Sequence, residues 1–125
     1  MNDQQKERVV SAVKAASNKW RVAFNSGDAS ECAAQYEGSA VMKAEPFGVF
    51  EGAENILAFW QKLIDDGFSD VEYVDPKIDV IDEQSAILSS AWKMNNAHGV
   101  IHRELWVVQS DGVAKLREDH FEAVG

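Results

Sequence analysis

Residues 36–63 read YEGSAVMKAEPFGVFEGAENILAFWQKL, and this stretch decides the expected fold. It holds two short strand-like segments, 40–43 and 49–52, on either side of the turn residues Glu45-Pro46-Phe47-Gly48. From Ala53 the pattern becomes helical, and Gly67 is expected to end the helix. The apolar residues that share one face of this helix are Ile56, Leu57, Trp60, Leu63 and Ile64. A strand pair that runs directly into a helix predicts a core around which the remaining segments close.

Two helices are expected before this stretch. Residues 3–26 carry an apolar stripe with helical spacing, made of Val9, Val13, Ala16, Trp20 and Phe24. The helix is expected to stop in the Asn-Ser-Gly turn that follows, since glycine adopts the left-handed conformation without a steric penalty. Asp28 has the features of an N-cap with Glu31 as its capping-box partner, which predicts a short second helix reaching Tyr36 and ended by Gly38.

After Gly67 the pattern changes from helical to extended. Four strands are expected, separated by turn-rich segments, and they lie at 71–81, 86–94, 100–108 and 113–124. Pro76 cannot donate a hydrogen bond, so the first of these strands should bend, bulge or lie at an edge there. Helices segregated from successive antiparallel strands predict one α+β domain over residues 1–125, with three helices and about six strands.

Composition excludes several classes of function. The chain has 12 Lys plus Arg against 21 Asp plus Glu, a formal charge of −9, which disfavours nucleic acid and anionic membranes as partners. No segment approaches the ~20 apolar residues that a membrane span needs. The single cysteine, Cys32, cannot form an internal disulfide, and a cytoplasmic location is expected. The histidines lack ligand-like spacing, so neither a metal site nor a cofactor is expected.

A group of residues then becomes recognisable as a set. It comprises Trp20, Phe24, Asn25-Ser26-Gly27-Asp28, Tyr36, Ala40-Val41, Phe50-Glu51-Gly52, Ile56, Phe59-Trp60 and Glu118-Asp119-His120-Phe121. With this set and this order of elements, the chain resembles the nuclear-transport-factor-2-like superfamily, particularly its SnoaL-like bacterial branch. The resemblance implies a cone-shaped sheet wrapped around the long first helix, a hydrophobic pocket at the open end, and a homodimer. The superfamily hosts isomerases, dehydratases, cyclases, hydrolases and association modules, so the fold leaves the reaction open.

Alternation along residues 100–108 puts Val100, His102, Glu104, Trp106 and Val108 on one face of a strand. Periodicity alone does not say which face points inward. Resemblance to ketosteroid isomerase puts Glu104 where that enzyme carries its protonated aspartic acid, which makes this face the pocket. His102 is then a candidate proton shuttle, whereas His120 is expected to be structural or on the outer face.

The same resemblance turns Arg117, Asp119 and Phe121 inward on the last strand. It leaves Trp20 at the position of the oxyanion-binding tyrosine of that enzyme. The general base falls at Ala44, or at Glu45 if the register slips by one residue before Pro46.

The function predicted from these residues is binding of, and acid–base chemistry on, a small hydrophobic molecule. Glu104 would act with Asp119 or Glu45, while His102 and Arg117 tune or orient. The aromatic residues Trp20, Phe24, Trp106 and Phe121 are expected to contact the ligand, with Trp60 as pure core.

The alternative is a non-catalytic module whose outer sheet face forms a homodimer. Arg103, Leu105 and Val107 would carry the contacts of that dimer. A cavity lined by Glu104 and Asp119 would favour the first hypothesis, and a closed interior would favour the second.

Overall fold

A computed structural model describes residues 2–125, and across them the chain forms three helices and six strands. The helices are α1 (Asp3–Asn25), α2 (Ala29–Ala34) and α3 (Ala53–Asp65). The strands are β1 (Tyr36–Glu45), β2 (Gly48–Glu51), β3 (Glu72–Val80), β4 (Ser85–Lys93), β5 (His98–Val108) and β6 (Ala114–Ala123). The α+β class and the order of elements predicted from the sequence are confirmed.

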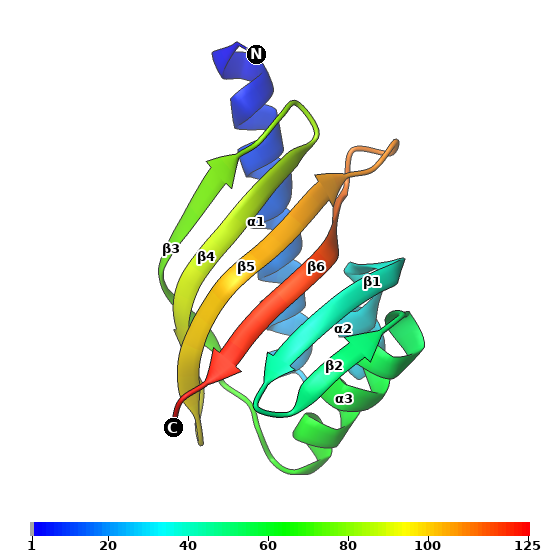
Figure 1. Ribbon diagram of the computed structural model, residues 1–125, viewed down its shortest axis with the longest axis vertical. Helices are drawn as coiled ribbons and strands as arrows, with labels where there is room; N and C mark the ends of the chain where they lie inside the picture. The colour runs from blue at the N-terminus through cyan, green and yellow to red at the C-terminus, as the bar shows by residue number, and fades with distance from the viewer. Residues whose placement is uncertain (1) are drawn as a thin grey trace.

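The six strands form one mixed sheet in the order β2-β1-β6-β5-β4-β3. β1 and β6 run parallel, and the other neighbouring strands run antiparallel. The long strands β3 to β6 curve along α1, while α2 and α3 lie beside β1 and β2 (Figure 1). The interior therefore lies between α1, α3 and the inner face of the sheet, as in the cone predicted above.

The turn after α1 ties the helix to the sheet. Gly27 has a φ of 77°, which explains why the helix ends in this turn. The Asn25 side chain accepts a hydrogen bond from the backbone N–H of Val71 at 2.7 Å and donates one to its carbonyl oxygen at 3.2 Å. Asp28 caps α2 by accepting from the backbone N–H of Glu31, but the Glu31 side chain bonds Gln35 instead of completing a capping box.

The predicted extent of the second helix is wrong. α2 ends at Ala34, and Tyr36 is the first residue of β1, paired with Leu116 of β6. Over the short segment 29–36, the apolar positions fit the period of a helix as well as that of a strand. The parallel pairing of Tyr36 with β6 makes this residue part of the strand. Tyr36 is thereby buried against the interior of the sheet.

The pairing of four strands shifts at a bulge or irregularity, and in β1 the shift lies between Tyr36 and Val41. In β3 the shift lies between Val74 and Lys77, around Pro76, and β3 is an edge strand, so the expectations for Pro76 are confirmed. In β5 the additional residue lies between Ile101 and Arg103, and in β6 it lies between Leu116 and Glu118. Since a bulge adds one residue to one strand, it exchanges the faces to which the following side chains point.

Aromatic rings join the helices to each other and to the sheet. Trp20 of α1 stacks on Phe24 with ring centroids 5.4 Å apart, and both meet the ring of Trp60 of α3 edge-on. Trp60 in turn stacks on Phe121 of β6 at 5.7 Å. No helix within residues 2–125 is both long and apolar enough to cross a membrane.

Gly99 of β5 provides a test of this packing. A Cβ at that position would overlap the carbonyl oxygen of Glu122 and lie 2.7 Å from the ring of Trp92. We expect Gly99→Ala to lower the free energy of unfolding by about 1–3 kcal/mol, measured by urea denaturation. Gly38→Ala is the matched control, because its Cβ would meet nothing within 4 Å, and it should be neutral or slightly stabilising. Equal stabilities of the two variants would contradict the packing described here.

Candidate active site

The bulge in β5 selects which of its side chains face the interior. Ile101 pairs with Phe121 and Glu104 pairs with Asp119, so His102 is the additional residue between them. Ile101, Glu104 and Trp106 are buried, whereas His102 is exposed. The inward orientation predicted for Glu104 and Trp106 agrees with the structure, and the one predicted for His102 is wrong.

The bulge in β6 has the same effect on the last strand. Leu116 is buried, Arg117 and Glu118 are both exposed, and Asp119 is buried again. Asp119 and Phe121 therefore face inward as expected. The inward orientation predicted for Arg117 is wrong, and its guanidinium instead forms two hydrogen bonds to the carboxylate of Glu37, at 2.7 and 3.1 Å.

A cavity of about 210 Å³ opens between α1, α3 and the sheet. Glu104 and Asp119 line it, and most of the remaining wall is aromatic or aliphatic. That wall consists of Trp20, Phe47, Trp60, Leu63, Phe68, Val71, Tyr73, Trp92, Met94, Asn96, Ala97, Ile101, Phe121, Ala123 and Gly125. No lysine, arginine or histidine is among the described residues that form this wall, so its ionisable groups are acidic or phenolic.

Glu104 and Asp119 are neighbours on adjacent strands. They are direct partners in the pairing of β5 with β6, and their exposed fractions are 6% and 4%. The indole N–H of Trp106 donates to Oε1 of Glu104 at 2.9 Å. The hydroxyl of Tyr36 donates to Oδ2 of Asp119 at 2.7 Å and accepts from the indole N–H of Trp60 at 3.3 Å. Each carboxyl group is thus oriented by an aromatic donor.

Burial dominates the electrostatics of the pair. It raises the pKa of Asp119 to about 7, although the hydrogen bond from Tyr36 lowers it in part. Burial also raises the pKa of Glu104 well above its usual value, and the nearby Asp119 charge raises it further, against a lowering by Trp106. Because two carboxylates at close range repel each other, the pair retains a proton at neutral pH.

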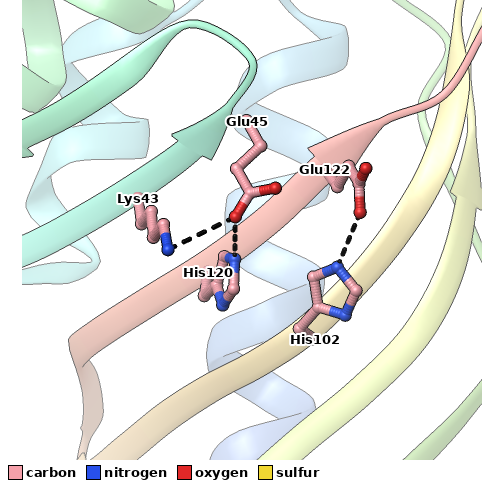
Figure 2. Close-up of polar contacts among 5 residues, drawn as sticks. All are labelled: Lys43, Glu45, His102, His120 and Glu122. Carbon is pink, nitrogen blue, oxygen red and sulfur yellow. Dashed lines mark hydrogen bonds and ion pairs between the residues drawn. The ribbon is translucent and has the colours of Figure 1, made fainter.

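Glu45 does not reach this cavity. Ala44 is the buried residue at that point of β1, and Glu45 points to the outer face of the sheet, away from α1. There its carboxylate lies 2.8 Å from Nε2 of His120 and 3.4 Å from Nζ of Lys43 (Figure 2). These contacts lower the pKa of Glu45, with the hydrogen bond to His120 as the largest cause. The prediction of Glu45 as a base in the pocket is therefore wrong.

His102 belongs to the same outer face. Its Nε2 lies 2.9 Å from Oε1 of Glu122, and its ring centroid lies 4.7 Å from that of His120 (Figure 2). The bulge explains this position, because it places His102 on the face opposite Glu104. The expectation that His120 lies outside is confirmed.

The aromatic candidates divide differently from the prediction. Trp20 and Phe121 line the cavity, as expected. Phe24 lies beneath Trp20, and Trp106 is buried behind Glu104. The expectation that Phe24 and Trp106 contact a ligand in the cavity is therefore wrong. Trp60, expected to be pure core, lines the cavity.

Sequence reasoning missed Tyr36, Tyr73 and Trp92. Tyr36 was missed because the sequence pattern assigned it to the second helix. The signal for a strand was the alternation of Ala40, Met42 and Ala44, which begins four residues later in β1. Trp92 shares its face of β4 with Ala86 and Leu88, and all three are buried, but no residue of that strand signals which face is inward. Within residues 2–125, no three His, Cys, Asp or Glu side chains come together as they would around a metal ion.

The fold of the chain was compared with solved structures. The arrangement of sheet and helices closely matches that of solved structures of the nuclear-transport-factor-2-like fold, so the fold predicted from the sequence is confirmed. One match is a nuclear-transport-factor-2-like protein of unknown function from Shewanella oneidensis, with a TM-score of 0.77 and 15% identity over 90% of this chain and 98% of the other.

Two other solved structures carry names of enzymes. A protein from Novosphingobium aromaticivorans that is provisionally described as a scytalone dehydratase has a TM-score of 0.83 and 14% identity, covering 99% of this chain and 89% of the other. A ketosteroid isomerase-like protein from Erwinia carotovora has a TM-score of 0.78 and 14% identity, covering 100% and 99%. At these identities the likeness establishes the fold alone. No protein-family profile and no curated protein sequence matches the chain.

The raised pKa of Asp119 predicts how stability depends on pH. In the unfolded chain a carboxyl of this kind titrates near about 4, whereas the folded-state pKa of Asp119 is about 7. Between these values the folded state binds more protons, so the contribution of Asp119 to the free energy of unfolding should fall as pH rises, by about 4 kcal/mol. Urea denaturation between pH 4 and 8 measures this slope.

Two variants separate the contribution of Asp119 from those of other carboxyls. Asp119→Asn should remove the part of the slope that Asp119 contributes, leaving the part from Glu104, and should exceed the wild type in stability at pH 8, because no charge forms at position 119. Glu51→Gln, at an exposed position of β2, should leave the slope unchanged. An unaltered slope in Asp119→Asn would contradict the raised pKa.

Proposed function

We propose that the chain is an acid–base enzyme that acts on a small, largely apolar molecule with a polar group, using Glu104 and Asp119. The observation that carries this proposal is the pair of carboxyl groups that share an apolar cavity and are not neutralised by a basic side chain. A purely structural interior would gain stability from apolar residues at these positions, since buried carboxyl groups cost free energy. Strongly perturbed ionisable groups in a cavity are typical of catalytic sites.

The two carboxyl groups differ in ways that suit different roles. Asp119, with a pKa of about 7, is ionised in a substantial fraction of molecules at neutral pH and is the general base. Burial and the nearby Asp119 charge raise the pKa of Glu104 well above its usual value, and Glu104 is the general acid. Oδ2 of Asp119 is occupied by the Tyr36 hydroxyl, whereas Oδ1 has no partner within the described residues and is free to take a proton.

In the proposed reaction, Asp119 removes a proton from a carbon next to the polar group of the substrate. The electron pair of that C–H bond moves towards the substrate oxygen, and Glu104 donates a hydrogen bond to that oxygen while keeping its proton. Return of the proton from Asp119 to a different carbon, as the carbonyl bond re-forms, completes an isomerisation. In a dehydration, Glu104 instead gives its proton to the departing hydroxyl group, which leaves as water, and transfer of the proton from Asp119 to Glu104 restores the starting state.

The size of the cavity limits the substrate. An apolar cavity of about 150 Å³ is large enough to hold benzene, so about 210 Å³ accommodates one ring with a small substituent. The aromatic wall excludes water from the carboxyl groups, which strengthens their interactions with a bound substrate. The dehydratase and isomerase names of two similar structures agree with this class of reaction.

A homodimer through the outer sheet face is a second, compatible proposal. Leu105 pairs with Ile87 across β5 and β4 on that face, and both remain partly exposed in the single chain. A second copy of the chain would cover these side chains together with the nearby Val107. The open cavity favours the catalytic hypothesis over a module without a ligand, but both can hold in a dimeric enzyme.

Turnover by variants tests the catalytic proposal. A thermal-shift screen of one-ring ketones, enones, phenols and epoxides identifies compounds that stabilise the folded chain, and NMR follows their conversion. Glu104→Gln and Asp119→Asn should each reduce kcat by at least about 100-fold, because each removes one partner in proton transfer. Glu122→Gln, a carboxyl on the outer face of β6, is the matched control and should retain activity. Undiminished turnover in the first two variants, or no conversion of any compound by the wild type, would refute the proposal.

Sedimentation equilibrium tests the dimer. The wild type should sediment with twice the mass of the chain, and Leu105→Glu should shift the equilibrium towards the monomer by placing a charge in the apolar contact. Val22→Glu introduces the same charge at an exposed position of α1 and should leave the dimer intact. A monomeric wild type at all concentrations would exclude this interface.

A further inference from the structure

Three buried polar atoms around the cavity have no hydrogen-bond partner within the described residues. They are Nε1 of Trp20, Nε1 of Trp92 and Oδ1 of Asp119, and all three residues line the cavity wall. Their side chains are at least nine-tenths buried, with exposed fractions of 8%, 7% and 4%. Buried polar groups in folded proteins are almost always hydrogen-bonded, so three such atoms at one cavity call for an explanation.

The two indoles are held in place by aromatic neighbours. The ring of Trp20 packs between Phe24 and Trp60, at centroid distances of 5.4 and 4.9 Å. The ring of Trp92 lies against the backbone of Gly99, where a Cβ would lie 2.7 Å from it, and meets Phe121 edge-on at 6.3 Å. Because the rings are fixed by packing, neither N–H can turn to find a partner elsewhere.

An indole N–H is a donor and cannot accept, so its missing partner is an acceptor atom. The other two tryptophans already have such partners, since Trp60 donates to Tyr36 and Trp106 donates to Glu104. Trp20 and Trp92 are therefore the two indoles whose N–H has no partner within the described residues. They come from α1 and β4.

The charges of the site decide what kind of acceptor fits. An anionic ligand would meet two carboxyl groups and, among the described lining residues, no basic side chain. A neutral oxygen avoids that repulsion and still satisfies an indole N–H. We propose that Trp20 and Trp92 recognise acceptor oxygens of a neutral one-ring ligand, such as a ketone or an ester. This inference rests on the proposed function and specifies the polar group of the substrate, a neutral acceptor oxygen near Glu104 and Asp119.

Three compounds of similar shape test this assignment in the wild type. Acetophenone carries a neutral acceptor, cumene lacks an acceptor, and benzoate carries an anionic one. Calorimetric titration at pH 7 should show that acetophenone binds about tenfold or more tightly than either of the others, since a satisfied buried donor favours the ketone. Benzoate binding as tightly as acetophenone, or no binding of acetophenone, would overturn the proposal.

Variants assign the effect to particular indoles. Trp20→Phe and Trp92→Phe keep an aromatic ring but remove the N–H, so at least one of them, the variant that lacks the donor to the ketone oxygen, should lose about five- to tenfold more affinity for acetophenone than for cumene. Trp60→Phe is the matched control, because its N–H bonds Tyr36, and it should change both affinities alike. Equal losses for the two ligands in the first two variants would show a packing role and refute recognition through the N–H.

A spectroscopic measurement in the wild type covers the case in which a variant does not fold. Acetophenone should shift the indole ¹H–¹⁵N signal of at least one of Trp20 and Trp92 downfield more than those of Trp60 and Trp106. The opposite pattern would overturn the proposal. These binding measurements do not require turnover, so acetophenone binding as expected, with none of the screened compounds converted, would leave recognition intact and refute catalysis alone.

Discussion

Burying two carboxyl groups side by side is the costly feature on which the site depends. Glu104 and Asp119 are direct partners on β5 and β6, and burial is the largest cause of the raised pKa of each. The surrounding residues reduce this cost through two aromatic donors, Trp106 and Tyr36, and not through a basic side chain. The pair therefore stays partly protonated at neutral pH, which is the state that acid–base chemistry requires.

The bulges at His102 in β5 and at Arg117 in β6 keep basic side chains away from the two carboxyl groups. With regular alternation from Glu104 and Asp119, His102 and Arg117 would also point inward, and the carboxyl groups would form buried ion pairs. An ion pair would lower the pKa of each carboxyl and hold it ionised. The additional residues move His102 to Glu122 and Arg117 to Glu37 on the outside of the sheet. One additional residue in each strand thus leaves the cavity with two carboxyl groups that can keep a proton, in place of carboxylates held ionised in ion pairs.

Local signals in the sequence were sufficient for the α+β class and the order of elements, whereas the cone-shaped sheet was predicted from the resemblance. The spacing of apolar residues gave α1 and α3, Gly27 marked the end of α1, and Pro76 marked an irregular edge strand. The same signals identified Glu104 and Asp119 once a resemblance had chosen the inner face. They could not reveal the bulges, because a bulge depends on the pairing of strands that are distant in the sequence. The errors at His102 and Arg117 follow directly from this limit, and the error at Tyr36 follows from the short length of α2.

The central claim is that the cavity holds a carboxyl pair that keeps a proton at neutral pH. The most direct test is a titration of the side-chain carboxyl ¹³C signals of the folded protein by NMR, with Glu104→Gln and Asp119→Asn used to assign them. The account predicts that Asp119 titrates near pH 7 and that the pKa of Glu104 lies well above its usual value. Titration of both groups near pH 4, as for exposed carboxyls, would contradict it.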